Sequence, residues 1–170
     1  MIILVTGGAR SGKSRYASEQ ALALSPRPLH VATARIWDEE FRERVDRHRA
    51  ERNAAWECVE EEKYIHRLSL HGRVAVIDCV TLWLTNFFVD EAQDVARSLN
   101  AFQAEVDVLH RTPGTFFIVT NEIGMGVHAE TEVGRRFTDL QGWANQYAAR
   151  LAERVVLMVS GIPVTIKGAP

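Results

Sequence analysis

The chain has 170 residues, of which 46% are hydrophobic, and its formal net charge is −2. This length and composition are typical of a globular protein, so we expect a single domain over residues 1–170. A general nucleic-acid-binding surface would be markedly basic and a membrane span needs about 20 apolar residues, so we expect neither. Two cysteines without metal-site spacing, and an apolar start without a basic leader, predict a cytoplasmic protein.

The first part of the chain contains a phosphate-binding motif. Residues 2–6 predict a buried strand, and apolar residues at helical spacing predict a helix from Lys13 to Leu24. The loop between them fits the pattern Gly, four residues, Gly-Lys-Ser, in which backbone N–H groups surround phosphate oxygens. Lys13 is expected to reach the β- and γ-phosphates of a nucleoside triphosphate, and Ser14 to ligate Mg²⁺. The predicted phosphate-binding residues are Gly7, Gly8, Ala9, Arg10, Ser11, Gly12, Lys13 and Ser14.

A predicted strand over residues 29–33 is followed by a charged helical stretch over residues 38–52. His48 falls in the apolar sector of this helix, with Arg44 and Arg52 one turn away on each side. One interpretation is a surface helix with solvated arginines and an incidental histidine. In the other, a neutral His48 attacks an α-phosphate while the arginines clamp the triphosphate. The residues by themselves leave both interpretations open.

Two later strands are expected to deliver carboxylates to one edge of the sheet. The strand over residues 74–78 ends in Asp78, which could cap the following turn but which we predict to hold Mg²⁺ opposite the loop serine. The strand over residues 115–120 leads to Glu122. Glu122 could order a nucleophile, a metal-bound water or a substrate hydroxyl, or it could hold the loop at residues 124–126 by accepting backbone N–H bonds. Both roles for Glu122 stay open.

The last long helix is predicted from Glu130 to Arg154, before a strand over residues 155–159 and an edge strand or hairpin over residues 164–167. Its core-facing residues are expected to be Val133, Phe137, Leu140, Ala144, Tyr147, Ala148 and Leu151. A separate stripe consists of Arg135, Asp139, Gly142 and Gln146. Arg135 and Asp139 could be a surface ion pair, but a mid-helix glycine costs about 1 kcal/mol relative to alanine. We therefore expect a ligand, a neighbouring helix or another subunit to approach Gly142.

The predicted strands are continuously apolar, which is typical of strands that are covered on both faces. Helical patterns separate most of them. The sequence therefore predicts an α/β fold: a three-layer P-loop domain with a mostly parallel sheet, helices on both faces, and the site at the carboxyl ends of the strands.

With these motifs in order, the chain resembles, nearly end to end, the bifunctional adenosylcobinamide kinase/adenosylcobinamide-phosphate guanylyltransferase family of cobalamin biosynthesis. The resemblance rests on residues 4–14, 32–34, 38–40, 44, 48, 52, 78–86, 120–126, 135–146 and 159–163. Some relatives carry a histidine pair where this chain has Arg47 and His48, and some carry glutamate at the position of Asp78. Members of this family carry a guanylyl group on a histidine at this position, and His48 is therefore the only candidate for that histidine here.

The resemblance implies two reactions. ATP or GTP would phosphorylate adenosylcobinamide, and GMP from GTP would then pass to that phosphate, giving adenosylcobinamide-GDP and pyrophosphate. It implies that His48 carries the guanylyl group and that the phosphate loop and Asp78 hold the triphosphate and Mg²⁺. It also implies a RecA-like sheet and a homo-oligomer, typically a trimer.

Two other functions are compatible with a phosphate loop. The first is a small-molecule kinase in which His48 is only structural. The second is a nucleotide-dependent switch, which would need a guanine-reading Asn-Lys-x-Asp segment. Residues 120–123 occupy a comparable place but lack the lysine and the aspartate, so we discount the switch.

Overall fold

The computed structural model describes residues 1–36 and 55–169. The predicted helix over residues 38–52, with Arg44, His48 and Arg52, lies outside the described residues. The described strands are β1 (Ile2–Gly7), β2 (Leu29–Ala32), β3 (Glu57–Glu60), β4 (Arg73–Asp78), β5 (Gly114–Val119), β6 (Arg154–Val159) and β7 (Ile162–Lys167). The described helices are α1 (Lys13–Leu24), α3 (Val80–Asp90), α4 (Val95–Arg111) and α5 (Glu132–Leu151), with short 3₁₀ turns η1 (Ile65–Arg67) and η2 (Ile123–Met125).

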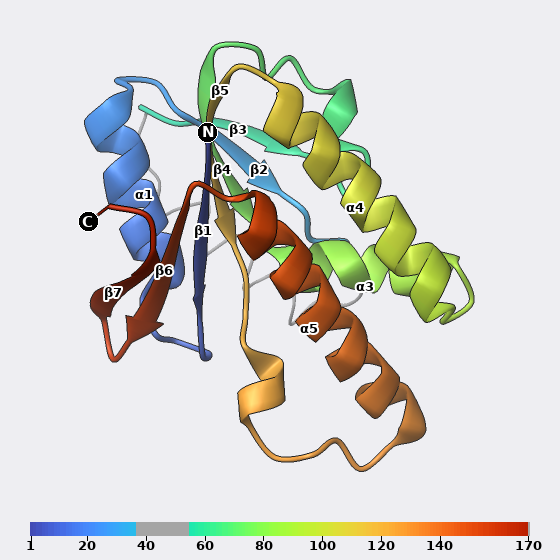
Figure 1. Cartoon of the computed structure of the whole chain (residues 1–170). Helices are drawn as coiled ribbons and strands as arrows, with labels where there is room; N and C mark the ends of the chain where they lie inside the picture. The colour runs from blue at the N-terminus through green and yellow to red at the C-terminus, as the bar shows by residue number, and fades with distance from the viewer. Residues whose placement is uncertain (37–54, 170) are drawn as a thin grey trace.

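The strands form one sheet in the order β3-β2-β4-β5-β1-β6-β7. All described pairs are parallel except β6 with β7, which are antiparallel. Helix α1 covers one face of this sheet, while α3, α4 and α5 pack together on the other (Figure 1). The predicted three-layer fold with a mostly parallel sheet is confirmed. The edge strand or hairpin expected over residues 164–167 is the longer strand β7, which forms an antiparallel hairpin with β6.

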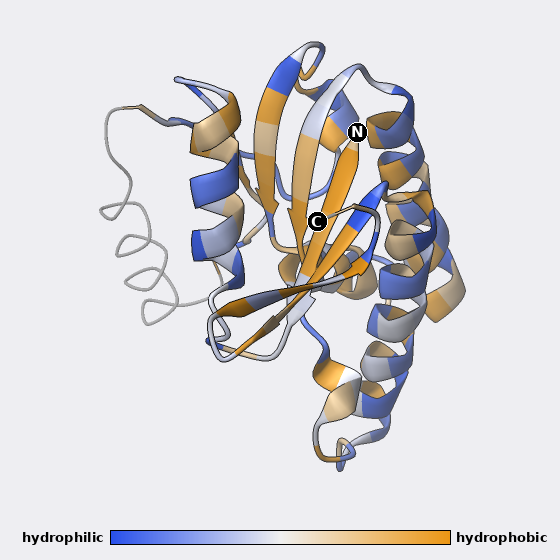
Figure 2. Ribbon diagram, turned by 60° about the vertical axis from the view of Figure 1, so that its left-hand side comes forward, coloured by the Kyte–Doolittle hydropathy of each residue, from blue (hydrophilic) through white to orange (hydrophobic). Residues whose placement is uncertain are grey.

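The central strands are largely hydrophobic, as the hydropathy colouring shows (Figure 2). Buried hydrophobic clusters lie on both faces of the sheet. The α3–α4–α5 face carries the larger core, with the aromatic side chains of Trp83, Phe87 and Phe102 fully buried. On the opposite face the small residues Ala17 and Ala21 let α1 approach the sheet closely. Burial on both faces is why the central strands read as continuous apolar runs.

Strand β3 was not predicted. Its sequence Glu-Cys-Val-Glu alternates between half-buried and exposed residues, and it pairs only with β2 at the end of the sheet. An edge strand needs no continuous apolar run, and charged residues at an edge protect it from pairing with another chain. Strand β3 therefore lacks the continuous apolar run from which the other strands were predicted.

Helix α5 is shorter than predicted. It begins after Thr131, whose side chain accepts a hydrogen bond from the N–H of Gly134, and it ends at Leu151. Arg154 belongs to β6 instead, where it pairs with Ile3 of β1. Val133 was expected to face the core, but 42% of its surface is exposed because the first turn of α5 extends past the sheet (Figure 1).

Across residues 1–36 and 55–169, the structure contains no helix that combines the length and the apolar character needed to cross a membrane.

Candidate functional site

The phosphate loop joins β1 to α1 in a shape that requires glycine. Gly7 has φ +145°, and a Cβ there would lie 2.6 Å from the carbonyl oxygen of Met158. Gly12 has φ +94° and immediately precedes α1. The turn between β6 and β7 supports the loop from outside, because the N–H of Gly161 donates to the carbonyl oxygen of Ser11 at 3.0 Å. The loop is therefore shaped by its own glycines and by close contact with β6 and β7.

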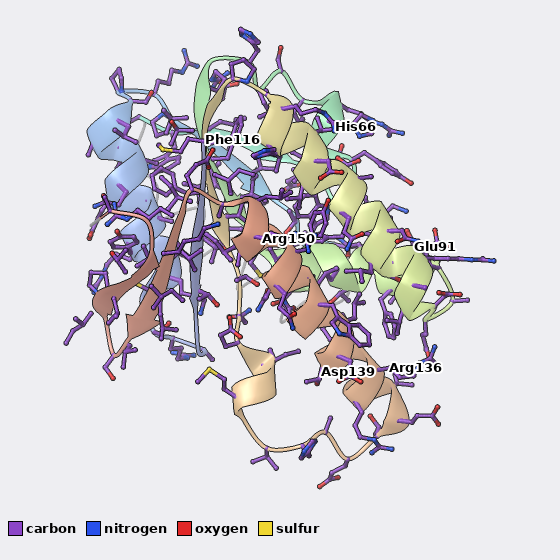
Figure 3. All side chains as sticks on the ribbon, viewed as in Figure 1. His66, Glu91, Phe116, Arg136, Asp139 and Arg150 are labelled. Atoms are coloured by element: carbon purple, nitrogen blue, oxygen red, sulfur yellow. The ribbon has the colours of Figure 1, made fainter. Side chains whose placement is uncertain are left out.

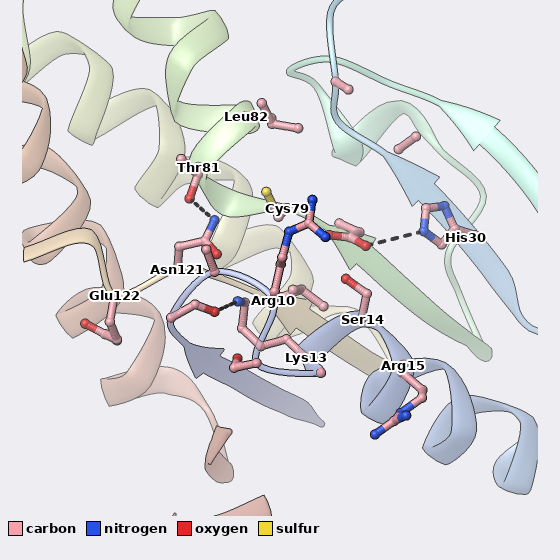
Figure 4. Close-up of a pocket in the computed structure, with 18 of the residues that line it drawn as sticks. Arg10, Lys13, Ser14, Arg15, His30, Cys79, Thr81, Leu82, Asn121 and Glu122 are labelled. Carbon is pink, nitrogen blue, oxygen red and sulfur yellow. Dashed lines mark hydrogen bonds and ion pairs between the residues drawn. The ribbon is translucent and has the colours of Figure 1, made fainter. Parts of the chain in front are cut away.

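Lys13 lies within this loop rather than extending into solvent. Only 7% of its surface is exposed, and its Nζ donates to the carbonyl oxygen of Gly8 at 2.5 Å (Figure 4). Burial lowers the pKa of Lys13, while the nearby Cys79, Asp78 and Glu122 act in the opposite direction. Burial disfavours the charged form of this ammonium group, and a nucleotide phosphate would stabilise that form as a strong anionic partner.

Asp78 ends β4 between the ends of β2 and β5. Its carboxylate is partly exposed, and its Oδ2 lies 3.9 Å from Nε2 of His30, a buried residue of β2 (Figure 4). His30 also lies edge-on to the Trp56 ring. The sequence does not mark His30 as a site residue, because one histidine within a predicted strand matches no motif. The parallel register of β2 and β4 brings it to Asp78.

The carboxylate of Glu122 is held by side chains from two other elements. Its Oε1 accepts a hydrogen bond from Thr6 Oγ1 at 2.5 Å and another from Asn145 Nδ2 at 3.2 Å. The predicted alternative, in which this carboxylate accepts N–H bonds from residues 124–126, is wrong. In the described structure the N–H of Met125 reaches the backbone carbonyl of Glu122 instead, at 3.5 Å. The carboxylate is thus free of the loop and lies at the cavity wall.

These groups converge on one cavity of about 1270 Å³ at the carboxyl ends of the strands (Figure 4). Its wall includes most of the predicted loop together with both predicted carboxylates: Gly8, Ala9, Arg10, Ser11, Gly12, Lys13, Ser14, Asp78 and Glu122. Gly7 is buried beneath the loop. The wall also contains four residues that were not predicted as site residues: His30, Cys79, Thr81 and Asn121. Asn121 Nδ2 donates to Thr81 Oγ1 at 2.9 Å, a contact between the loop after β5 and the first turn of α3 that only the folded sheet brings together.

The side chains of Ser14 and Asp78 fit a magnesium site. Both line the cavity and both offer oxygen, the donor atom that Mg²⁺ prefers. No cluster of three or more His, Cys, Asp or Glu side chains suited to a metal occurs within residues 1–36 and 55–169. A phosphate-loop enzyme does not need one, because the nucleotide phosphates and water complete the coordination.

The polar stripe on α5 lies apart from the residues that line the cavity. Arg135, Asp139 and Gln146 are exposed, and Figure 3 shows Asp139 on the first half of α5. In the described structure Arg135 does not pair with Asp139, because its guanidinium donates to the carbonyl oxygens of Ala129 and Glu130. A Cβ on Gly142 would meet nothing within 4 Å. The expected neighbouring helix is therefore absent from the described residues, and approach by a ligand or another subunit stays a prediction.

Comparison with known proteins identifies the family. A model of the family described as cobinamide kinase/cobinamide phosphate guanyltransferase matches residues 3–166. The bifunctional adenosylcobalamin biosynthesis protein CobP of Pseudomonas aeruginosa is 38% identical over 171 residues, which cover 98% of each chain. CobU of Escherichia coli, which bears the same bifunctional description, is 38% identical over 183 residues, covering 98% of this chain and 100% of that protein.

A solved structure supports the fold independently. The structural study of PH0250 from Pyrococcus horikoshii OT3 describes a chain with a TM-score of 0.56 and 9% sequence identity, covering 99% of this chain and 87% of that one. Similarity at 9% identity supports only the fold, whereas the curated relatives are 38% identical over 98% of this chain. The chain therefore belongs to the cobinamide kinase/cobinamide phosphate guanyltransferase family, whose members are bifunctional kinases and guanylyltransferases.

Proposed function

We propose that this chain phosphorylates adenosylcobinamide with ATP or GTP and then transfers GMP from GTP to the resulting phosphate. The products are adenosylcobinamide-GDP and pyrophosphate. The observation that carries the proposal is the cavity in which the phosphate loop, Lys13, Asp78 and Glu122 converge, in a chain that belongs to this family. We further propose a cytoplasmic protein that assembles as a homo-oligomer, with a trimer expected from the resemblance.

In the kinase step, a hydroxyl oxygen of the corrinoid substrate attacks the γ-phosphorus. The bond between the γ-phosphorus and the β-phosphate oxygen breaks, and a nucleoside diphosphate leaves. Lys13 and the loop N–H groups stabilise the negative charge that develops on the phosphates. Ser14 and Asp78 would hold Mg²⁺, which supplies further electrostatic stabilisation of the triphosphate when bound. Glu122 accepts the hydroxyl proton.

In the second step, His48 attacks the α-phosphorus of GTP and pyrophosphate leaves. An oxygen of the corrinoid phosphate then displaces the imidazole, so that GMP is transferred and the histidine is regenerated. Arg44 and Arg52 would bind the triphosphate, because guanidinium groups form bidentate hydrogen bonds with phosphate. These three roles rest on the family resemblance and on the chemistry of the residue types. A covalent intermediate of this kind predicts ping-pong kinetics for GMP transfer.

The test is to incubate the protein with magnesium and GTP labelled at the α-phosphate. A phosphoramidate adduct is acid-labile and base-stable, and we expect it on the wild type and not on the His48→Ala variant. His110→Ala removes an exposed histidine at the end of α4 and serves as the matched control, which should retain the label. Corrinoid phosphorylation without any adduct would reduce the function to that of a plain kinase.

A further inference from the structure

A buried hydrogen-bond network runs from α5 to the carboxylate of Glu122. Asn145, only 8% exposed, extends from the middle of α5 and donates from Nδ2 to Glu122 Oε1 at 3.2 Å. Thr6, at the end of β1, donates to the same oxygen at 2.5 Å. Both donors therefore occupy one carboxylate oxygen, and within residues 1–36 and 55–169 no side chain or backbone group donates to the other, Oε2.

The amide of Asn145 is itself held in one orientation. Its Oδ1 accepts hydrogen bonds from Thr120 Oγ1 at 2.6 Å and from Gln141 Nε2 at 3.0 Å. Its Nδ2 also donates to the carbonyl oxygen of Asn121 at 3.0 Å. Because two donors meet Oδ1, a flipped amide would place its N–H₂ against them. Nδ2 must therefore face Glu122.

The network also ties Glu122 to the phosphate loop. The N–H of Glu122 donates to the carbonyl oxygen of Gly7 at 3.2 Å, next to the Thr6 side chain that holds its carboxylate. Backbone and side chain are thus both attached to the end of β1, where the loop begins. The position of the carboxylate relative to a bound γ-phosphate is consequently set by β1 itself.

From this geometry we infer that Thr6 and Asn145 are positioning residues, which hold Glu122 so that its Oε2 receives the proton of the substrate hydroxyl during phosphoryl transfer. This role rests on the proposed kinase function. The hydroxyl proton moves to Oε2 as the oxygen bonds to the γ-phosphorus and the nucleoside diphosphate leaves. A carboxylate with one oxygen already occupied needs little reorganisation when the hydroxyl arrives, which lowers the barrier to transfer.

Paired substitutions of Thr6 test the inference. Thr6→Val keeps the shape of the side chain and removes the donor, while Thr6→Ser keeps the donor. General-base catalysis is worth about 10²–10⁴-fold, and loss of one positioning contact should remove part of it, so we expect kcat for corrinoid phosphorylation to fall about tenfold in Thr6→Val. The Kd for the nucleotide and the KM for the corrinoid should stay within about twofold of wild type, and Thr6→Ser should restore kcat.

A second pair places the effect at the Glu122 contact. Asn145→Leu removes the other donor and should lower kcat in the same way. Tyr147→Phe is the matched control, since it also removes a hydrogen-bond donor from α5, but this donor bonds to Asp107 and takes no part in the network around Glu122. Tyr147→Phe should therefore keep kcat within about twofold of wild type.

Three outcomes would overturn the inference. The first is a Thr6→Val variant as active as Thr6→Ser. The second is a loss of nucleotide binding or of thermal stability that accounts for the whole loss of activity, which indicates a structural role. The third is an equal loss of kcat in Tyr147→Phe and Asn145→Leu. A wild-type protein that transfers no phosphoryl group would instead refute the proposed function, and this role with it.

Discussion

Replacing Gly7 with alanine tests most directly whether the phosphate loop requires glycine at this position. The new Cβ would lie 2.6 Å from the backbone carbonyl oxygen of Met158 and 2.9 Å from Ser11 Oγ. The first contact is with backbone of the adjacent strand β6, which cannot move without breaking its pairing with β1. The φ of +145° is also unfavourable for any residue with a Cβ. Strain and steric overlap therefore act together.

The magnitude follows from these two costs. A strained backbone conformation costs about 1–3 kcal/mol, and overpacking in a close-packed region costs a similar amount. We expect Gly7→Ala to lower the free energy of unfolding by about 3 kcal/mol, a large share of the roughly 5–15 kcal/mol that stabilises most proteins. Urea unfolding followed by the fluorescence of the four tryptophans would measure the loss.

Gly8→Ala is the matched control for stability. A Cβ on Gly8 would meet nothing within 4 Å, so its free energy of unfolding should stay within about 0.5 kcal/mol of wild type. If Gly7→Ala and Gly8→Ala unfolded at the same urea concentration, the proposed steric requirement at Gly7 would be refuted. A stable Gly7→Ala variant with normal nucleotide binding would refute it equally.

Three further predictions concern other parts of the molecule. Gly142→Ala should raise the free energy of unfolding by about 1 kcal/mol, measured by urea unfolding. An unchanged or lower free energy of unfolding would contradict this prediction. A stabilised variant that loses activity would indicate that a ligand or another subunit binds this face of α5. Arg35 and Lys63 form ion pairs with Asp90 and hold the pKa of its carboxyl well below the usual range. These ion pairs therefore stabilise the fold above about pH 4, the ordinary pKa of Asp. Their contribution is lost as the pH falls below that value and through the pKa of the folded state. Asp90→Asn should therefore be less stable than wild type by about 1 kcal/mol at pH 7, with a difference that shrinks below pH 4 in thermal unfolding; a constant difference would contradict the assignment. Burial raises the pKa of the Cys79 thiol to about 11. Iodoacetamide at neutral pH should therefore label the exposed Cys58 and leave Cys79 unmodified. Equal labelling of the two cysteines, measured by mass spectrometry of peptides, would contradict the burial of Cys79.

Several features could be predicted from the sequence because their signals are local. The strand, glycine loop and helix at residues 2–24 follow from contiguous residues, and the structure places α1 at the predicted bounds, Lys13–Leu24. Asp78 ends β4 and Glu122 follows β5, and these strands are parallel, so the meeting of the two carboxylates at one edge follows from the parallel sheet alone. The ends of α5 were less predictable, since a helical pattern does not show where the sheet stops covering it.

The tertiary structure decided which side chains complete the site. Thr6 and Glu122 are 116 residues apart, and Asn145 reaches Glu122 only because α5 packs beside β1. His30 meets Asp78 through the register of β2 and β4. The sequence by itself determined the fold class, the phosphate loop and the carboxylates at the strand ends, because short-range periodicity and motif spacing encode them. Only the packing of α5 and the pairing of distant strands determined the partners of those carboxylates, because a hydrogen bond depends on a distance that no single segment of the chain specifies.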